Sequence, residues 1–72
     1  MNKSELTAEF WDALPVAFFH QDTVAAILGI HAKALEYRRW KKIGPPYRKI
    51  GGRAVYQKAD VLEWIYGHEL IK

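Results

Sequence analysis

The chain has no cysteine and a single serine, Ser4, among its 72 residues. Without cysteine it can form neither a disulfide framework nor a zinc site with thiolate ligands. No apolar run approaches the roughly 18 residues of a membrane span, and the charges in the opening sequence MNKSELTAEFWD are unlike a signal peptide. These absences predict a cytoplasmic, unprocessed protein that does not associate with membranes.

Residues that could catalyse a reaction or hold a metal ion are also scarce. Nothing near Ser4 would activate its hydroxyl as a nucleophile. The three histidines, His20, His31 and His68, are scattered and have no cysteine or paired acids beside them, so they predict no metal site. A chain of 72 residues also leaves little room for an enclosed cleft. We therefore predict a protein that is not an enzyme and needs no cofactor, metal ion or small-molecule ligand.

Acidic residues are nearly missing from the middle of the chain, where basic residues are concentrated. Between Ile27 and Lys58 the one acid is Glu36. The same stretch holds nine of the eleven basic residues: Lys33, Arg38, Arg39, Lys41, Lys42, Arg48, Lys49, Arg53 and Lys58. A chain of net charge +3 thus places about +8 in fewer than half of its residues, which is typical of a surface that binds phosphates.

Half of the residues are hydrophobic, enough for one small packed core. The spacing of apolar residues predicts four helices, over about Glu5 to Ala13, Gln21 to Leu28, Ala32 to Lys41 and Lys58 to Gly67. Ser4 is the expected N-cap of the first helix, and Gly29 the expected end of the second. Val16 to Phe19 is expected to be an extended lead-in. The first and last helices are expected to bury Leu6, Phe10, Ala13, Leu14, Val61, Leu62, Trp64, Ile65 and Leu70.

The third predicted helix is polar and basic, and Leu35 is its one strong core residue. A turn that contains Gly29 joins it to the second helix. Two helices joined in this way, the second of them basic, indicate a helix-turn-helix, whose second helix lies in the DNA major groove. Lys33 and Tyr37 are expected to contact bases or phosphates. The more distal cations are expected to contact phosphates without sequence preference: Arg38, Arg39, Lys41 and Lys42.

A β-hairpin is predicted after the third helix. The sequence Gly44-Pro45-Pro46 ends the helix, because proline cannot continue it. Tyr47 to Ile50 and Ala54 to Gln57 read as two short strands around Gly51-Gly52-Arg53, a typical hairpin turn. The slim basic tip beside a basic helix predicts a wing that either enters a minor groove or lies along phosphates. For Trp40 the two alternatives are stacking on a base and packing against this hairpin, and the second is expected in the recognition of a duplex.

The segment from Phe19 to Ile65, about two-thirds of the chain, resembles a known family. Its sequence carries, in order, AILGI with Leu35 six residues after Gly29, then GPPY, KIGGR, and Tyr56 followed by DVLEWI. Together these features resemble the small winged helix-turn-helix family related to the MerR DNA-binding domain, which includes excisionases of phages and integrative elements and AlpA-like regulators. The family commonly has Ser or Thr at the helix cap, where this chain has His31.

The resemblance implies a recognition helix in the major groove, a wing in the adjacent minor groove, and binding of several copies near a recombinase attachment site. By position, it implies that the groove-facing residues are His31, Ala32, Lys33, Glu36 and Tyr37. It implies phosphate contacts from Arg38 or Arg39. The wing residues that it implies are Arg48, Lys49, Gly52 and Arg53.

We therefore predict a mainly α protein with a small two-stranded β-hairpin: a winged helix-turn-helix of the MerR or excisionase type with an additional N-terminal helix. Residues 1–14 are expected to hold that helix, and residues 15–72 the DNA-binding domain. The predicted function is sequence-specific binding of double-stranded DNA by a bacterial or phage-encoded excisionase, which would act architecturally with an integrase and further copies of itself. The alternatives are a small transcriptional regulator of a mobile element and, in another class, a protein-interaction adaptor that uses Trp11, Val55 and the C-terminal helix.

Overall fold

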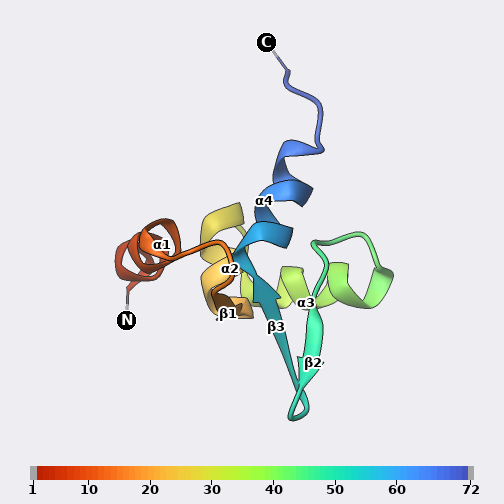
Figure 1. Ribbon diagram of the computed structural model, residues 1–72. Helices are drawn as coiled ribbons and strands as arrows, with labels where there is room; N and C mark the ends of the chain where they lie inside the picture. Colours follow the sequence, from red (N-terminus) through yellow and green to blue (C-terminus); the bar gives the residue numbers. More distant parts are fainter. Residues whose placement is uncertain (1, 72) are drawn as a thin grey trace.

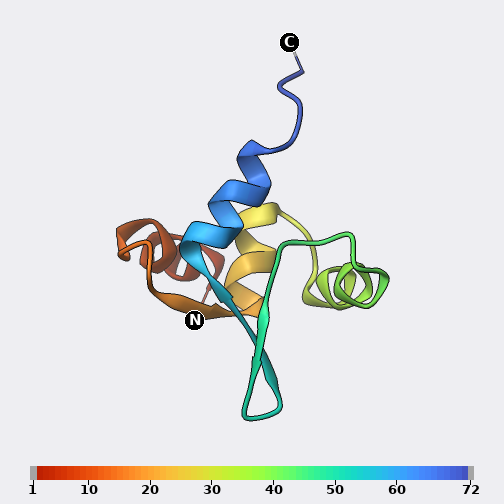
Figure 2. The ribbon, with the colours of Figure 1, turned by 45° about the vertical axis from the view of Figure 1, so that its right-hand side comes forward.

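The computed structural model describes residues 2–71 as four helices and one three-stranded antiparallel sheet. The elements are α1 (Lys3–Asp12), β1 (Phe18–His20), α2 (Gln21–Leu28), α3 (Ala32–Lys41), β2 (Arg48–Ile50), β3 (Arg53–Gln57) and α4 (Lys58–Tyr66). The strand order is β1-β3-β2, so β3 is the central strand (Figure 1). α1 and α3 lie on opposite sides of α2, while the β2–β3 hairpin and α4 extend in opposite directions (Figures 1 and 2).

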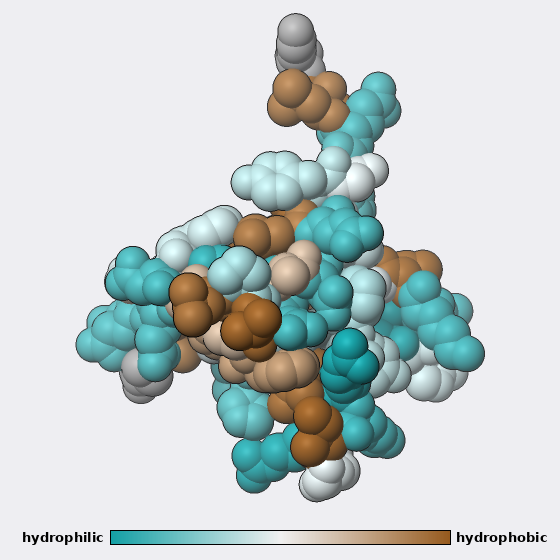
Figure 3. Space-filling model, viewed as in Figure 1, coloured by the Kyte–Doolittle hydropathy of each residue, from teal (hydrophilic) through white to brown (hydrophobic). Residues whose placement is uncertain are grey.

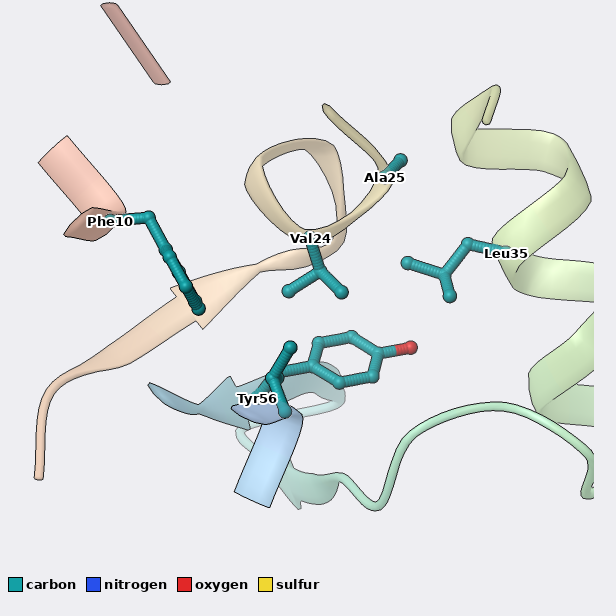
Figure 4. Close-up of a cluster of buried hydrophobic side chains, with 6 residues drawn as sticks. Phe10, Val24, Ala25, Leu35 and Tyr56 are labelled. Atoms are coloured by element: carbon teal, nitrogen blue, oxygen red, sulfur yellow. The ribbon is translucent and has the colours of Figure 1, made fainter. Parts of the chain in front are cut away.

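One hydrophobic core joins all four helices to the sheet. Its buried side chains come from each helix and from β3: Phe10, Val24, Ala25, Leu35, Tyr56 and Val61. The ring of Tyr56 lies beneath Val24, and its hydroxyl points toward α3 (Figure 4). Because Phe10 of α1 is fully buried with the others, α1 contributes to the same core as the rest of the described chain.

The predicted hairpin is present, but it belongs to a larger sheet than expected. β2 pairs with β3, and Gly51 and Gly52 connect them with φ of 58° and 81°. Positive φ at both positions is typical of a type I′ turn, which glycine adopts without steric cost. The expected two-stranded sheet is wrong, because β1 pairs with the other edge of β3 and sets Phe19 opposite Tyr56. The sequence indicated only an extended lead-in there, since three residues are too few to show strand alternation.

Three expectations about the ends of helices are wrong. The N-cap of α1 is Asn2, whose Oδ1 accepts a hydrogen bond from the backbone N–H of Glu5 at 2.9 Å, and Ser4 lies inside the helix. Leu14 is 72% exposed and Leu70 is 81% exposed. Both were expected to be buried, but α1 ends at Asp12 and α4 at Tyr66. The helical repeat therefore does not extend to either leucine.

Lys58 joins the end of α1 to the start of α4. Its side chain is buried, and its ammonium group donates to the carbonyl oxygens of Trp11, at 3.0 Å, and Ala13, at 2.7 Å. A cation here satisfies carbonyls that the end of α1 leaves unpaired and interacts favourably with the helix dipole. The backbone N–H of Lys58 also donates to the carbonyl oxygen of Ala17 at 2.9 Å. Lys58 is therefore not part of the exposed basic surface, although it lies in the basic stretch of the sequence.

Replacing Lys58 with methionine is expected to lower the free energy of unfolding by about 1–3 kcal/mol, because two carbonyl groups lose a buried donor. Urea denaturation followed by circular dichroism measures this change. Lys3→Met, at an exposed position of α1, is the matched control and is expected to change stability by less than about 0.5 kcal/mol. Equal stabilities of the two variants would mean that the two hydrogen bonds contribute nothing.

Candidate nucleic-acid interface

A short turn from Gly29 to His31 sets the direction of α3 relative to α2. Gly29 has a left-handed backbone with φ of 71°, and the N–H of Ile30 donates to the carbonyl oxygen of Ala25 at 3.0 Å. Glycine favours this conformation because it has no Cβ. His31 is exposed and occupies the N-cap of α3 with an extended backbone and no side-chain capping hydrogen bond. The turn thus allows α3 to direct Leu35 into the core and its opposite face outward.

The outward face of α3 carries side chains spaced three or four residues apart. Lys33, Glu36, Tyr37 and Trp40 are all exposed, with Tyr37 at 56% and Trp40 at 74%. This spacing places them on one side of a helix. Ala32, which was also expected to face a groove, is half-buried and packs against the core. Four of the five groove-facing residues predicted from the resemblance are therefore exposed, counting His31 with Lys33, Glu36 and Tyr37.

The expectation that Trp40 packs against the hairpin is wrong. Its ring centroid lies 6.3 Å from that of Tyr37, and Lys41 Nζ lies 5.2 Å from the Trp40 centroid and 5.9 Å from the Tyr37 centroid. Trp40 is on the side of α3 opposite Leu35, because a separation of five residues is nearly one and a half helical turns. The C-terminal end of α3 thus presents two aromatic rings and a cation to the surroundings.

Arg39 is held by the protein, whereas Arg38 is exposed. The Nη1 atom of Arg39 donates to Gln21 Oε1 at 3.0 Å and to the Tyr56 hydroxyl at 3.1 Å. Its guanidinium carbon lies 5.6 Å from the centroid of the Tyr47 ring. The resemblance implied a phosphate contact from Arg38 or Arg39, and of these two Arg38 is the accessible one. Gln21, which no sequence pattern singled out, links α2 to α3 through Arg39.

The hairpin carries the remaining predicted residues, and Arg48, Lys49, Gly52 and Arg53 are all exposed. Arg48 is paired with Val55, Lys49 with Ala54, and Ile50 with Arg53. Since paired residues point to the same face of a sheet, Arg48 and Arg53 share one face, and Lys49 lies on the face that bears Tyr56. Both faces of the slender hairpin therefore carry positive charge.

Side chains of α3 and of the hairpin meet around one hollow. This hollow lies at the start of α2 and is lined by His20, Gln21, Asp22, Arg39, Gly52, Arg53 and Ala54. Arg53 of the hairpin therefore lies near Gln21, the residue that also bonds to Glu36 on α3. We use the name α3–hairpin face for the exposed residues of α3 and of both faces of the adjoining hairpin: Lys33, Glu36, Tyr37, Trp40, Lys41, Arg48, Lys49 and Arg53.

The charges of the described chain are unevenly distributed. Five cations lie on the α3–hairpin face, and two more flank it toward α4, where Arg38 and Lys42 line hollows that include Trp64. The acidic helix α1, with Glu5, Glu9 and Asp12, lies on the opposite side of the molecule from α3 (Figure 2). Hydrophobic residues gather over the connection between α1 and β1 (Figure 3), where the exposed ones are Leu14, Val16 and Phe18.

No protein-family model matches the chain, and a search of curated proteins finds no similar sequence. Across residues 2–71, none of the helices has the length and apolar character needed to cross a membrane. In the same part of the chain, no three His, Asp or Glu side chains are grouped so that they could hold a metal ion. The function is therefore inferred from the geometry and charge of the chain itself.

Proposed function

We propose that the protein is a winged helix-turn-helix protein that binds double-stranded DNA, with α3 in the major groove and the β2–β3 hairpin as the wing. The observation that carries this proposal is the α3–hairpin face, to which α3 contributes two exposed cations beside an outer side that is not buried, and the hairpin contributes three exposed cations. Duplex DNA carries one phosphate charge per about 1.7 Å of its axis, so it suits a face of this charge. Its major groove, about 12 Å wide, admits an α-helix.

We assign a different kind of DNA contact to each group of residues on this face. Arg48, Lys49 and Arg53 project from a narrow hairpin with a glycine turn, a shape that fits beside or within a minor groove. Lys33, Glu36 and Tyr37 lie on the outer side of α3, where side chains would reach base edges. Arg38 and Lys42, at the margin, would contact phosphates. Arg39 positions α3 from within the protein through Gln21 and Tyr56.

The role in recombination rests on the resemblance to excisionases. In that role the protein would act architecturally in the cytoplasm, bending DNA or recruiting an integrase, and it would have no catalytic activity of its own. The exposed Leu14, Val16 and Phe18 support a protein contact on the side away from α3, as this role requires. An excision assay with the integrase of the same element separates this role from that of a transcriptional regulator, which would alter promoter activity without stimulating excision.

Binding to a duplex of mixed sequence is expected to weaken steeply with salt, with a slope of log K against log salt of about −3.6 to −4.5, corresponding to about four to five phosphate contacts. Fluorescence anisotropy at salt concentrations from about 50 to about 200 mM measures this slope. Lys3→Ala, on α1, is expected to leave the slope unchanged. Absence of binding at the lowest salt concentration would contradict the proposed function and favour a protein-interaction adaptor.

A further inference from the structure

Glu36 is the one acid in the basic stretch, and it lies exposed on the α3–hairpin face. Its Oε1 atom accepts a hydrogen bond from Gln21 Nε2 at 2.9 Å. DNA phosphates repel a carboxylate, so a carboxylate at a DNA interface is accommodated where the DNA presents a hydrogen-bond donor. An ionised carboxylate has about four acceptor sites on its two oxygens, so Glu36 can accept from DNA while it keeps its bond to Gln21.

A chain of hydrogen bonds holds Glu36 from the core outward. The hydroxyl of Tyr56, a fully buried residue, accepts from Arg39 Nη1 at 3.1 Å, and the same Nη1 donates to Gln21 Oε1 at 3.0 Å. Because Arg39 only donates, the amide oxygen of Gln21 must face it, and the amide NH₂ group must then face Glu36. The carboxylate is thus oriented by residues of α2, α3 and β3 before any DNA binds.

We propose that Glu36 reads a cytosine in the major groove by accepting a hydrogen bond from its N4 amino group, and that Gln21 is the positioning residue for this contact. This inference rests on the proposed function. The major groove offers two amino donors, cytosine N4 and adenine N6. Adenine N6 stands beside N7, an acceptor that repels a carboxylate, whereas the groove edge of cytosine presents the donor alone. Cytosine is therefore the base that Glu36 suits.

The test is selection from a randomised duplex library by the full chain, followed by sequencing of the bound fraction. The wild type is expected to enrich cytosine about tenfold over other bases at one position. Glu36→Gln is expected to change the preferred base at that position to adenine, because an amide pairs with both N6 and N7 of adenine. Gln21→Ala is expected to reduce the cytosine preference several-fold while the other positions keep theirs. Glu63→Gln, at an exposed position of α4, is the control and should leave the motif unchanged.

Each outcome decides the inference. It is overturned if Glu36→Gln selects the same motif as the wild type, or if the wild type does not select cytosine. Binding without enrichment of any base would be consistent with the proposed DNA binding, but it would overturn the proposal that Glu36 recognises cytosine. No binding even at low salt would overturn both. Since Glu36 is exposed, Glu36→Gln should fold, as its melting temperature will verify, so the test stands even if Gln21→Ala lowers stability.

Discussion

Replacing Tyr56 with alanine is expected to lower the free energy of unfolding by about 3–5 kcal/mol, the usual range for a buried aromatic side chain. Tyr56 is 0% exposed and is the largest of the fully buried side chains. It occupies the central strand, and its hydroxyl accepts from Arg39. A chain of 72 residues has a total stability of about 4–11 kcal/mol at 0.05–0.15 kcal/mol per residue. The substitution should therefore remove at least about a quarter of the total stability, and it would unfold the protein if that stability is near the low end of this range.

Urea denaturation followed by circular dichroism measures this loss, with Tyr56→Phe as the matched variant. Phenylalanine keeps the ring and removes the hydroxyl, which is expected to cost only about 0.5–1.5 kcal/mol. The difference between the two variants separates the packing of the ring from the bond to Arg39. If both variants lose the same free energy, the ring does not contribute to the core as its burial implies.

Replacing Arg48, Lys49 and Arg53 together with alanine is expected to reduce affinity for duplex DNA by about a hundredfold at about 0.15 M salt. The reason is that each phosphate contact contributes about 0.9 to the salt slope, so three lost contacts reduce its magnitude by about 2.7. All three residues are exposed on the hairpin, so each substitution should change stability by less than about 0.5 kcal/mol. Anisotropy titrations over a range of salt give both the affinity and the slope.

Two controls make this result specific to the hairpin. Lys3→Ala removes a cation from α1 and should change neither quantity. Arg38→Ala removes an exposed cation of α3 that is assigned to a phosphate, and it should reduce the slope independently of the hairpin. An unchanged slope in the hairpin variant beside a reduced slope in the α3 variant would show that the hairpin lies away from DNA and that the winged arrangement is wrong.

Much of the fold follows from local sequence. α2 and α3 span the predicted residues, because the end of each is set by adjacent signals: Gly29 with its left-handed backbone, and Gly44-Pro45-Pro46 shortly after Lys41. The glycine turn of the hairpin is likewise local. β1 was not predicted, because its strand character depends on pairing with β3, far along the chain. Asn2 and Ser4 are both favourable caps, so composition alone could not choose between them.

The candidate interface was predicted less completely than the fold. The exposure of Lys33 and Tyr37 could be predicted, because their helix has one strong core residue, Leu35, and its other side chains are left to face outward. The sequence could not separate Arg39 and Lys58 from the exposed cations, because their partners lie in distant segments. Trp40 was expected to be packed but is exposed, because the burial of a tryptophan depends on the rotation of its helix, which the sequence does not determine. Whether these residues contact DNA stays a prediction.

β3 passes into α4 without a loop, since the strand ends at Gln57 and the helix begins at Lys58. One residue inserted within β3 would turn Tyr56 to the opposite face of the sheet and rotate α4 by about 100° about its axis. Residues inserted between Gly51 and Gly52 would instead lengthen the projecting ribbon and leave the interior intact. The length of this ribbon is therefore the dimension that can change most freely as such a sequence diverges. The number of residues from Arg53 to Lys58 is fixed, because it sets the packing of Tyr56 and α4 in the core.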